Sequence, residues 1–479
     1  MRIIRKITAF ALMLCLLTAA LCAHAEPVLE ETNPIQTPAE ILLSTKDGSW
    51  SFGFGRRQII PDENSDQPLY IAGYNSGMEV SEVLDYCEAR ALWLDAGGEG
   101  VLLIAIDCVA LDSATVAEIR GRLADIPGCA SVNVISSHTH AGADTLGLWG
   151  PMGINGKNDG YMNALITAAA EAGREAAGSR QECTLCFGLA ETFGMYRDSR
   201  IPDVFDANLY QLRAVPEDGG PGVRLYIYGA HAESLRGSNS RLSRDFPGVL
   251  CDRMREITGD NTMFMPGPIG GLIMTKEFYP TDIDAVKNLT VTADKLVGYA
   301  QSITPESEQE LAPEIALSRQ EFIVPLDNTA FLLYKFLGIL GSNAVPFESA
   351  TGYGVKSELS ILTLGDIALA LIPGEIFPEL VTGEAYGDAN PDGVNPRPLK
   401  EIAGENGLSR LIVAGLANDE LGYIVPPSDF LLSEKLPYLD KTMDYKGENH
   451  YEETNSVGPE CANVIAEAFE AAAKALCEN

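Results

Sequence analysis

The sequence predicts an α/β fold in which mixed β-sheets are flanked by helices, in one continuous domain over residues 49–479. The 479 residues are 46% hydrophobic and 21% charged, a balance typical of a globular protein rather than a disordered or fibrous one. From Trp50 onward, apolar strand-like runs alternate with Ala-rich helical stretches. No long linker, repeat or low-complexity run interrupts this alternation.

The predicted strands are short apolar runs. Residues 101–106 (VLLIAI) are apolar without alternation, which indicates a strand buried on both faces. Further strands are expected at residues 132–135, 224–228, 367–372 and 410–413. The pair Cys183 and Cys186 lies in another strand-like stretch, where positions i and i+3 point to opposite faces. We therefore expect buried, apolar cysteines rather than a zinc or redox pair, although an exported location would permit disulfides.

The predicted helices alternate with these strands. Asp112 and Ser113 offer an N-cap for a helix that runs through Leu123, and a second helix is expected over residues 161–177. The chain closes with a helix over residues 461–477. Its apolar face combines Val464, Ile465, Ala468, Phe469, Ala472 and Leu476.

The N-terminus has the composition of a secretory signal peptide. Residues 1–6 are basic, residues 7–21 are apolar, and Ala23-His24-Ala25 gives the small-x-small pattern that signal peptidase cleaves. An uncleaved membrane anchor is the alternative, since the apolar run is nearly long enough to span a bilayer. We expect a signal peptide at residues 1–25, an acidic flexible tether at 26–48, and an exported protein with no other membrane span.

The acidic balance of the chain argues against several classes of partner. There are 34 Lys and Arg against 67 Asp and Glu, which gives a formal net charge of −33. A surface of that sign repels phosphate backbones and anionic headgroups, so nucleic-acid binding is not expected. The oligomeric state is left open.

Histidine is rare, and its placement is the most informative feature of the chain. There are five histidines, and one of them lies in the signal segment. His138 and His140 directly follow the predicted strand at 132–135, and His231 follows the strand at 224–228. In open α/β sheets, ligand sites collect where strands end at their C-terminal edge. A His-x-His pair in extended chain would also present both rings on one side.

Carboxylates and a phenol follow two other predicted strands. Glu375 comes after the strand at 367–372, and Asp419, Glu420 and Tyr423 come after the strand at 410–413. Two histidines plus a carboxylate suit Zn²⁺ and leave a position for water or a fourth donor. A single histidine after a strand is more often an ordinary loop residue. From the residues alone, two interpretations are therefore about equally supported: a metal site built from these histidines, or ordinary loop histidines without a shared role.

Ordered blocks over about residues 50–475 resemble the N-terminal catalytic region of neutral/alkaline (non-lysosomal) ceramidases. The most specific block is SSHTHAGAD, which is similar to the family's GTHTHSGP. LGDIALALIPGE resembles the family strand that ends in PGE, and AGLANDELGYIVP resembles GLxNxYxxYxTT. The resemblance implies the fold of that catalytic region, here without the family's C-terminal immunoglobulin-like domain.

The resemblance also implies a set of site residues. Carried over by position, the zinc ligands are His138, His231, Glu375 and Tyr423. His140 corresponds to the second histidine of its block, which lies beside the metal and assists catalysis. Arg197 corresponds to the arginine of the family's NRSP block, near the substrate. Tyr451 corresponds to the tyrosine of RYEGAS, which faces the active site.

The chain departs from the family pattern where the family carries its nucleophile. The serine of NVGDVSPN corresponds to Ile273, and Gly271 replaces the aspartate. A zinc site without that serine can still hydrolyse, because Zn²⁺ polarises a carbonyl and lowers the pKa of bound water. His140 would act as general acid or base, with Glu420 or Asp419 as further candidates for the base.

The expected function is thus an exported zinc-dependent hydrolase that cleaves an amide by metal-activated water. The substrate would be an N-acyl lipid such as ceramide, or a related amide or ester. Arg197 or Tyr451 would stabilise the oxyanion. Two alternatives stay open: a catalytically inactive zinc-containing binding protein that retains the fold, and a metal-free acidic surface protein.

Overall fold

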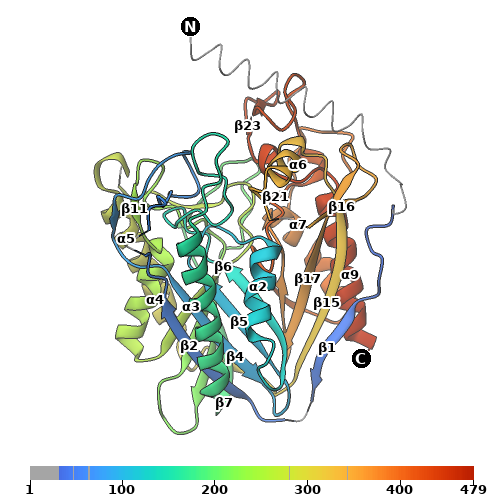
Figure 1. Cartoon of the computed structure of the whole chain (residues 1–479). Coiled ribbons are helices and arrows are strands. Elements are labelled where there is room, and N and C mark those ends of the chain that lie inside the picture. Colours follow the sequence, from blue (N-terminus) through green and yellow to red (C-terminus); the bar gives the residue numbers. More distant parts are fainter. Residues whose placement is uncertain (1–31, 47, 63–64, 280, 342, 479) are drawn as a thin grey trace.

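The computed structural model describes residues 32–478, apart from residues 47, 63–64, 280 and 342. The predicted signal peptide at 1–25 lies outside the described residues. Two mixed β-sheets form the centre of the molecule and pack face to face, and helices cover the outer face of each sheet (Figure 1). The α/β class with mixed, helix-flanked sheets is confirmed.

The larger sheet contains nine of the strands in the described residues, in the order β12-β10-β9-β7-β2-β4-β5-β6 with β14 beside β7. Pairing is parallel between β5 and β6 and between β10 and β12, and antiparallel among the strands between them. The strands are β2 (Ser51–Gln58), β4 (Glu88–Asp95), β5 (Gly100–Ile106), β6 (Cys129–Ser136), β7 (Gln181–Glu191), β9 (Asn208–Pro216), β10 (Val223–Tyr228), β12 (Asn261–Pro266) and β14 (Gln309–Glu310).

The smaller sheet contains six strands of the described chain, in the order β1-β15-β17-β18-β20 with β16 beside β17. Only β18 and β20 run parallel within it. The strands are β1 (Glu40–Thr45), β15 (Ile315–Pro325), β16 (Ala344–Pro346), β17 (Tyr353–Leu364), β18 (Ile367–Leu371) and β20 (Arg410–Ala414).

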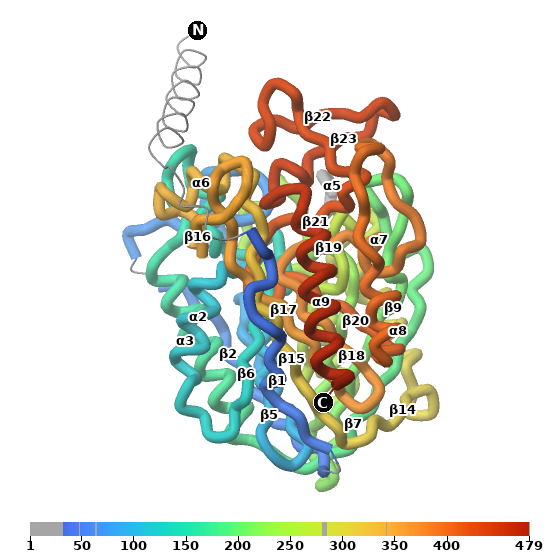
Figure 2. The backbone as a smooth tube through the Cα atoms, turned by 90° about the vertical axis from the view of Figure 1, so that its right-hand side faces the viewer, coloured from blue at the N-terminus to red at the C-terminus, as the bar shows by residue number. Residues whose placement is uncertain are grey.

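Helices shield the outer faces of both sheets. On the larger sheet, α2 (Ser113–Leu123) and α3 (Asp159–Gly178) cover β4 and β5, while α4 (Asp245–Thr258) and α5 (Thr281–Ser302) cover the region of β9, β10 and β12. On the smaller sheet, α9 (Cys461–Glu478) lies across β15 and β17, with α8 (Leu399–Glu405) beside it (Figure 2). The remaining helices are α6 (Thr329–Phe336) and α7 (Pro378–Thr382).

Two-residue strands order the loops at the ends of these sheets. They are β3 (Glu82–Val83), β8 (Tyr196–Arg197), β11 (Arg241–Leu242), β13 (Met274–Thr275), β19 (Glu375–Ile376), β21 (Tyr423–Ile424), β22 (Thr442–Met443) and β23 (Asn449–His450). Short 3-10 turns occur at Pro427–Asp429 and Glu452–Asn455.

The predicted elements lie close to those in the structure. Asp112 caps α2 as expected, because its carboxylate accepts a hydrogen bond from the Thr115 N–H. The apolar face predicted for α9 is buried except for Leu476, which is partly buried. The eight cysteines in the described residues are free, and five of them are buried.

The flexible tether expected at residues 26–48 does not hold for its last part. Residues 40–45 form β1, which pairs antiparallel with β15 at the edge of the smaller sheet. Leu43 is buried in the core between the sheets. Its hydrogen-bonding partner lies about 275 residues further along the chain, since Ser44 pairs with Ala316, so no local periodicity signalled the strand.

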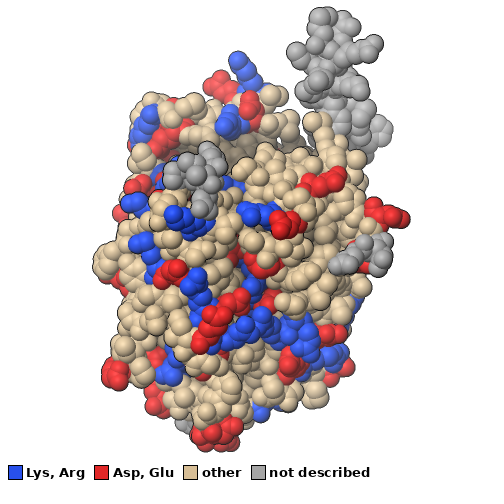
Figure 3. Space-filling view, turned by 90° about the vertical axis from the view of Figure 1, so that its left-hand side faces the viewer, with Lys and Arg blue, Asp and Glu red and all other residues tan. Residues whose placement is uncertain are grey.

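Two surface properties bear on possible partners. Among the described helices, none is both long and apolar enough to cross a bilayer. On the face that carries α4 and α5, basic and acidic side chains are interspersed (Figure 3), and Arg253 of α4 pairs with Asp294 of α5 at 2.7 Å.

Candidate metal centre

The two histidines of the His-x-His pair are brought together by a turn. β6 ends at Ser136, and His138 then adopts a positive φ of 62°. The pair is therefore not extended as the sequence analysis assumed. His140 is anchored by its backbone N–H, which donates to the Ala232 carbonyl at 2.9 Å. The Nε2 atoms of His138 and His140 come to within 3.1 Å of each other.

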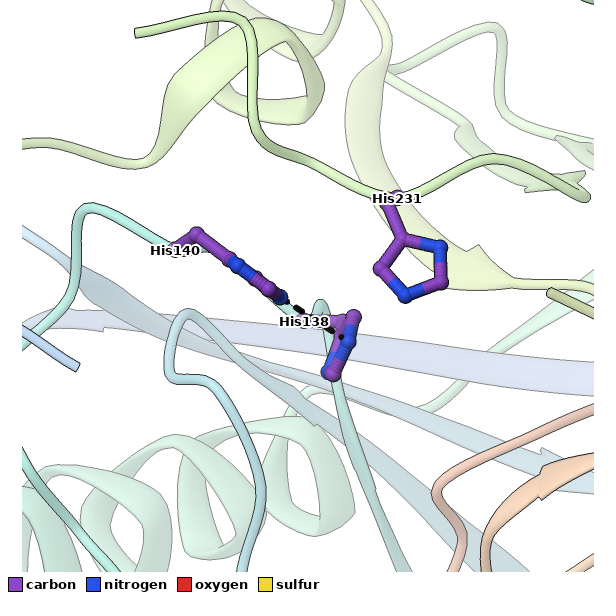
Figure 4. A group of neighbouring side chains, drawn as sticks. All are labelled: His138, His140 and His231. Carbon is purple, nitrogen blue, oxygen red and sulfur yellow. Dashed lines mark hydrogen bonds between the residues drawn. The ribbon is translucent and has the colours of Figure 1, made fainter. Parts of the chain in front are cut away.

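His231 completes a group of three buried imidazoles (Figure 4). It follows β10, and the residue after it pairs with Thr139 in a parallel bridge that holds the two strand ends together. Ring centroids lie 4.7 Å apart for His138–His140 and His138–His231, and 5.6 Å apart for His140–His231. The exposed fractions are 3%, 8% and 0% for His138, His140 and His231. This buried group can hold a metal ion.

Backbone carbonyls set the tautomers of two of these histidines. The Nδ1 atom of His138 lies 2.7 Å from the Val109 carbonyl, and that of His231 lies 2.8 Å from the Ile273 carbonyl. A carbonyl oxygen only accepts, so Nδ1 carries the proton in both rings. In its neutral form, each ring would then present the Nε2 lone pair to the centre of the group, and this is the form of imidazole that binds a cation.

Glu375 and Tyr423 reach the same point from the smaller sheet. They are direct partners in the parallel pair β19–β21. Glu375 Oε2 lies 2.9 Å from His231 Nε2 and 3.4 Å from His138 Nε2, and the Tyr423 hydroxyl lies 3.4 Å from His231 Nε2. Donors about 2.0–2.1 Å from one tetrahedral Zn²⁺ lie roughly 3.3 Å apart, so the spacing fits a single ion.

Burial and neighbouring charges shift the pKa values of the side chains at this point. Burial raises the pKa of Glu375, but His138 and His231 outweigh it and hold that pKa well below its usual range. Burial lowers the pKa of His140, and the neighbouring His138 lowers it further. Burial and then the charge of Glu375 raise the pKa of Tyr423. A cation would reverse this last effect and favour the phenolate.

Tyr451 lies beside the candidate metal centre, whereas Arg197 does not. The ring centroids of Tyr451 and Tyr423 are 6.2 Å apart, and both rings line one cavity. Arg197 lies in β8, its side chain is 56% exposed, and its nearest acidic partner is Glu277 at 3.9 Å. The structure therefore groups His138, His140, His231, Glu375, Tyr423 and Tyr451, and leaves Arg197 outside that group.

The cavity next to the metal centre is mostly apolar. Its polar residues include His138, His140, Glu375, Tyr423 and Tyr451 at one end. Its other described lining residues are Gly73, Val109, Ala110, Asp112, Leu146, Leu148, Trp149, Leu326, Phe331, Leu340, Val355, Asp419, Glu420, Leu421, Gly422, Asn455 and Val457. The apolar wall was not predicted, because it is assembled from several loops together with Phe331 of α6 and Val355 of β17, which share no common sequence pattern.

Two groups around His140 were also missed. Glu233 Oε2 lies 3.8 Å from His140 Nδ1 and accepts a hydrogen bond from the Tyr74 hydroxyl. The Tyr74 ring meets the His140 ring edge to face, with centroids 5.2 Å apart. Glu233 follows His231 by two residues, so its position could have been read from the sequence, whereas Tyr74 had no such signal.

Ile273 contributes its backbone rather than its side chain. Its carbonyl accepts hydrogen bonds from both the backbone N–H and the Nδ1–H of His231. Its side chain is fully buried and is not among the residues that line the cavity. Thr275, the nearest hydroxyl in sequence, is also buried outside that lining.

Comparison with known proteins shows the fold. No protein-family model matches the chain, and a search of curated proteins found no match. The solved structure of neutral ceramidase from Pseudomonas aeruginosa has a TM-score of 0.69 at 17% identity, over 90% of this chain and 75% of that one. A ceramidase described as complexed with C2 has a TM-score of 0.66 at 16% identity, over 90% and 76% of the two chains. The fold implied by the sequence resemblance is therefore confirmed.

His450, which had no predicted role, lies in a separate buried cluster around Arg200. The Arg200 side chain is 1% exposed and pairs with Asp429, with Glu452 at 2.9 Å and with Glu453 at 3.3 Å. His450 Nδ1 lies 2.7 Å from Glu453 Oε1 and 3.0 Å from Arg200 Nη2. These contacts join the loop after β8 to the segment before α9, and the residues of this cluster are not among those that line the cavity.

Glu379 is a buried acid near this cluster, and we expect its protonation to make the stability of the protein depend on pH. Burial and then Asp198 and Asp429 raise its pKa from 4.5 to about 8. Between these two pH values, the folded protein keeps the Glu379 proton whereas the unfolded chain has released it. The stability that the protonated Glu379 contributes is therefore lost as the pH rises through about 8. Between about pH 5 and pH 9, the Tm of the wild type should fall more steeply than that of Glu379→Gln. If the Tm of the two proteins fell equally with pH, the raised pKa of Glu379 would be contradicted.

Proposed function

We propose that the protein is an exported zinc-dependent hydrolase that cleaves the amide bond of an N-acyl lipid such as ceramide, or of a related amide or ester. The supporting observation is the convergence of four donors, His138 Nε2, His231 Nε2, Glu375 Oε2 and the Tyr423 hydroxyl, at spacings suited to one ion. The export rests on the N-terminal segment, which lies outside the described residues. The fold that the chain shares with two solved ceramidase structures supports amide hydrolysis.

The residues around the four donors suit this chemistry. When bound, Zn²⁺ supplies a Lewis acid that polarises a carbonyl and makes water more acidic. His140 stands beside His138, and its Nδ1 has no hydrogen-bond partner among the described residues, so it can exchange a proton with the substrate. Tyr451 lines the cavity and is better placed than the exposed Arg197 to donate to an oxyanion.

The apolar wall of the cavity suits an acyl chain. Leu146, Leu148, Trp149, Phe331 and Leu340 lie along it. Burying such a chain contributes about 0.8 kcal/mol for each CH₂ group, so a long acyl chain would bind much more tightly than an acetyl group. Polar amides without a chain would lack this contribution.

Metal analysis together with a substrate panel tests the proposal. The purified protein should contain about one zinc per chain and hydrolyse long-chain N-acyl amides more efficiently than acetyl amides. Removal of zinc by a chelator should abolish turnover, and added zinc should restore it. Absence of bound zinc, or turnover that survives its complete removal, would contradict the proposal.

The binding-protein alternative is favoured by one observation, the replacement of the family's serine by Ile273. Under this alternative, the protein would contain zinc, bind N-acyl amides and release them unchanged. The same substrate panel separates the two functions, because turnover that depends on His138 excludes a role in binding alone.

A rim of exposed apolar side chains near the cavity should assist reaction at a lipid surface. Met152, Ile154 and Leu337 are 73%, 59% and 55% exposed, and Asn155 links the two rim loops by donating to the Gly338 carbonyl at 3.1 Å. Inserting two such side chains into lipid is worth a few kcal/mol, so Ile154→Ser with Leu337→Ser should slow hydrolysis of vesicle-borne substrate by about tenfold or more. Ile257→Ser, an exposed apolar residue at the end of α4, is the matched control.

Equal loss with a soluble short-chain substrate would contradict a role in contact with lipid, because the rim would then act on the cavity itself. Vesicle sedimentation provides an independent readout, since the double variant should bind neutral vesicles less tightly than the control.

A further inference from the structure

The cavity lacks a side chain that is suited to attack a carbonyl. Among its described lining residues there is no Ser, Thr, Cys or Lys. Ile273 and Thr275 are both buried outside the lining. If the protein is the hydrolase proposed above, the nucleophile is water. Attack by water requires a base within hydrogen-bonding reach of it.

Most carboxylates that line the cavity are already engaged. Asp112 caps α2 and pairs with Lys157 at 2.7 Å. Asp419 accepts from the Ser113 N–H at 2.8 Å and from the Ser357 hydroxyl at 2.9 Å. Glu375 faces His138 and His231 as a metal donor. None of these three is free to take a proton from water.

Glu420 is the exception. Burial and then the charge of Glu375 raise the pKa of Glu420, and a cation at Glu375 would offset that charge and favour the carboxylate form that can accept a proton. Glu420 Oε1 accepts a hydrogen bond from the Gly422 N–H at 2.7 Å, whereas its Oε2 is shielded from solvent and has no hydrogen-bond partner in the described part of the chain. Leaving a buried polar atom unpaired costs about 1–3 kcal/mol, so this feature calls for an explanation. A water or substrate group in the cavity would satisfy it.

The backbone around Glu420 is held firmly enough to position a catalytic group. The side chain of Asn418 accepts from the Val134 N–H at 2.9 Å, and the Asn418 N–H donates to the Val134 carbonyl at 2.8 Å. The loop is thereby clamped to β6, the strand that leads to His138. Three residues after Glu420 the chain reaches Tyr423, so both side chains enter the cavity from the same segment.

Glu420 is also a departure from the family block. In GLxNxYxxYxTT its position corresponds to the first tyrosine, and Ile273 corresponds to the serine. The chain thus lacks the family's hydroxyl nucleophile and has gained a carboxylate in the same cavity. These two departures are complementary, since removal of a nucleophile leaves a need for a base that activates water.

We propose that Glu420 is the general base that activates the attacking water, an inference that rests on the proposed hydrolase function. Glu420 Oε2 takes a proton from water as the water oxygen forms a bond with the carbonyl carbon. The C–N bond then breaks, and the proton passes from Glu420 to the leaving nitrogen. The products are a carboxylic acid and an amine, and no acyl-enzyme forms.

The variant Glu420→Gln tests this assignment against the wild type. General-base catalysis contributes roughly 10²–10⁴-fold, so kcat should fall by that factor while KM and zinc content stay unchanged. The matched control is Glu379→Gln, which makes the same change at a buried glutamate whose Oε2 is also unpaired but which lies outside the cavity lining. It should retain the wild-type kcat.

Two further measurements distinguish a catalytic role of Glu420 from a merely structural one. Added formate should restore part of the turnover of Glu420→Ala, because it can occupy the space of the missing carboxylate. Hydroxylamine should trap no acyl-enzyme from the wild type during turnover. Rescue would also show that the variant is folded.

The outcomes separate this inference from the proposed function. A wild-type protein without amide or ester hydrolysis would overturn the proposed function, and the inference with it. An active wild type with Glu420→Gln within about threefold of its kcat would overturn the inference alone. Trapping of a hydroxamate from the wild type would likewise overturn it and leave the hydrolase in place.

Discussion

Replacement of His231 by Ala is expected to remove bound metal and hydrolysis together. His231 is fully buried, and its Nε2 lies 2.9 Å from Glu375 Oε2 and 3.4 Å from the Tyr423 hydroxyl. Loss of a hydrogen bond to a metal ligand already costs about 10–100-fold in affinity, and loss of the ligand itself should cost more. The variant also leaves Glu375 with one imidazole instead of two.

Zinc content after dialysis and turnover of an N-acyl amide are the two measurements. His450→Gln is the control, since His450 is a buried histidine in the Arg200 cluster and not a metal donor. The control should keep zinc and kcat but lose some stability. The wild type should also show a higher Tm with zinc than without it, because the ion binds only the folded state, and His231→Ala should not. A His231→Ala protein that retains stoichiometric zinc would exclude the proposed ligand set.

The largest effect on stability is expected from Arg200→Met. Arg200 is almost fully buried and is paired with Asp429, Glu452 and Glu453. Its removal leaves these carboxylates buried without the guanidinium, while His450 Nδ1 still lies 2.7 Å from Glu453 Oε1. Breaking a buried ion pair by removal of one partner typically costs about 3–5 kcal/mol.

Urea unfolding at neutral pH measures this loss, with Arg197→Met as the matched control. Arg197 lies three residues away, but its side chain is 56% exposed and its nearest carboxylate is 3.9 Å distant. An exposed pair of this kind contributes about 0–1 kcal/mol. The two arginine variants should therefore differ by several kcal/mol in the free energy of unfolding. Similar losses in both would show that the Arg200 cluster adds little to stability. At acidic pH the difference should shrink, because protonation removes the uncompensated negative charges.

The contrast between Arg197 and Arg200 shows where the sequence analysis was limited. Both arginines occur in the same polar stretch, MYRDSRIP, and nothing in their spacing separates them. The structure places Arg200 against acids that lie more than 220 residues further along the chain. Burial and pairing of that kind depend on which loops meet, and a local pattern does not encode it.

The His-x-His pair is a second instructive case. The prediction that both rings converge is confirmed, but the reason given for it was wrong, because His138 has a positive φ and the segment is not extended. The turn is maintained by contacts with Ala232 and Val109, which lie in the loops after β10 and β5. The residue types revealed the chemistry, and the surrounding chain determines the geometry.

The sequence by itself determined the α/β class, the main strands and helices, and the strand ends at which the candidate ligands occur. These features are local, because apolar runs, helical spacing and caps depend on residues that are neighbours in the chain. They can therefore be recognised in the sequence itself. Only the tertiary structure decided that β1 joins the smaller sheet, that Arg200 is buried while Arg197 is exposed, and that Glu420 retains an unpaired oxygen in the cavity. Those features arise from contacts between segments far apart in the chain, where packing and the satisfaction of buried polar atoms, rather than local propensity, select the arrangement.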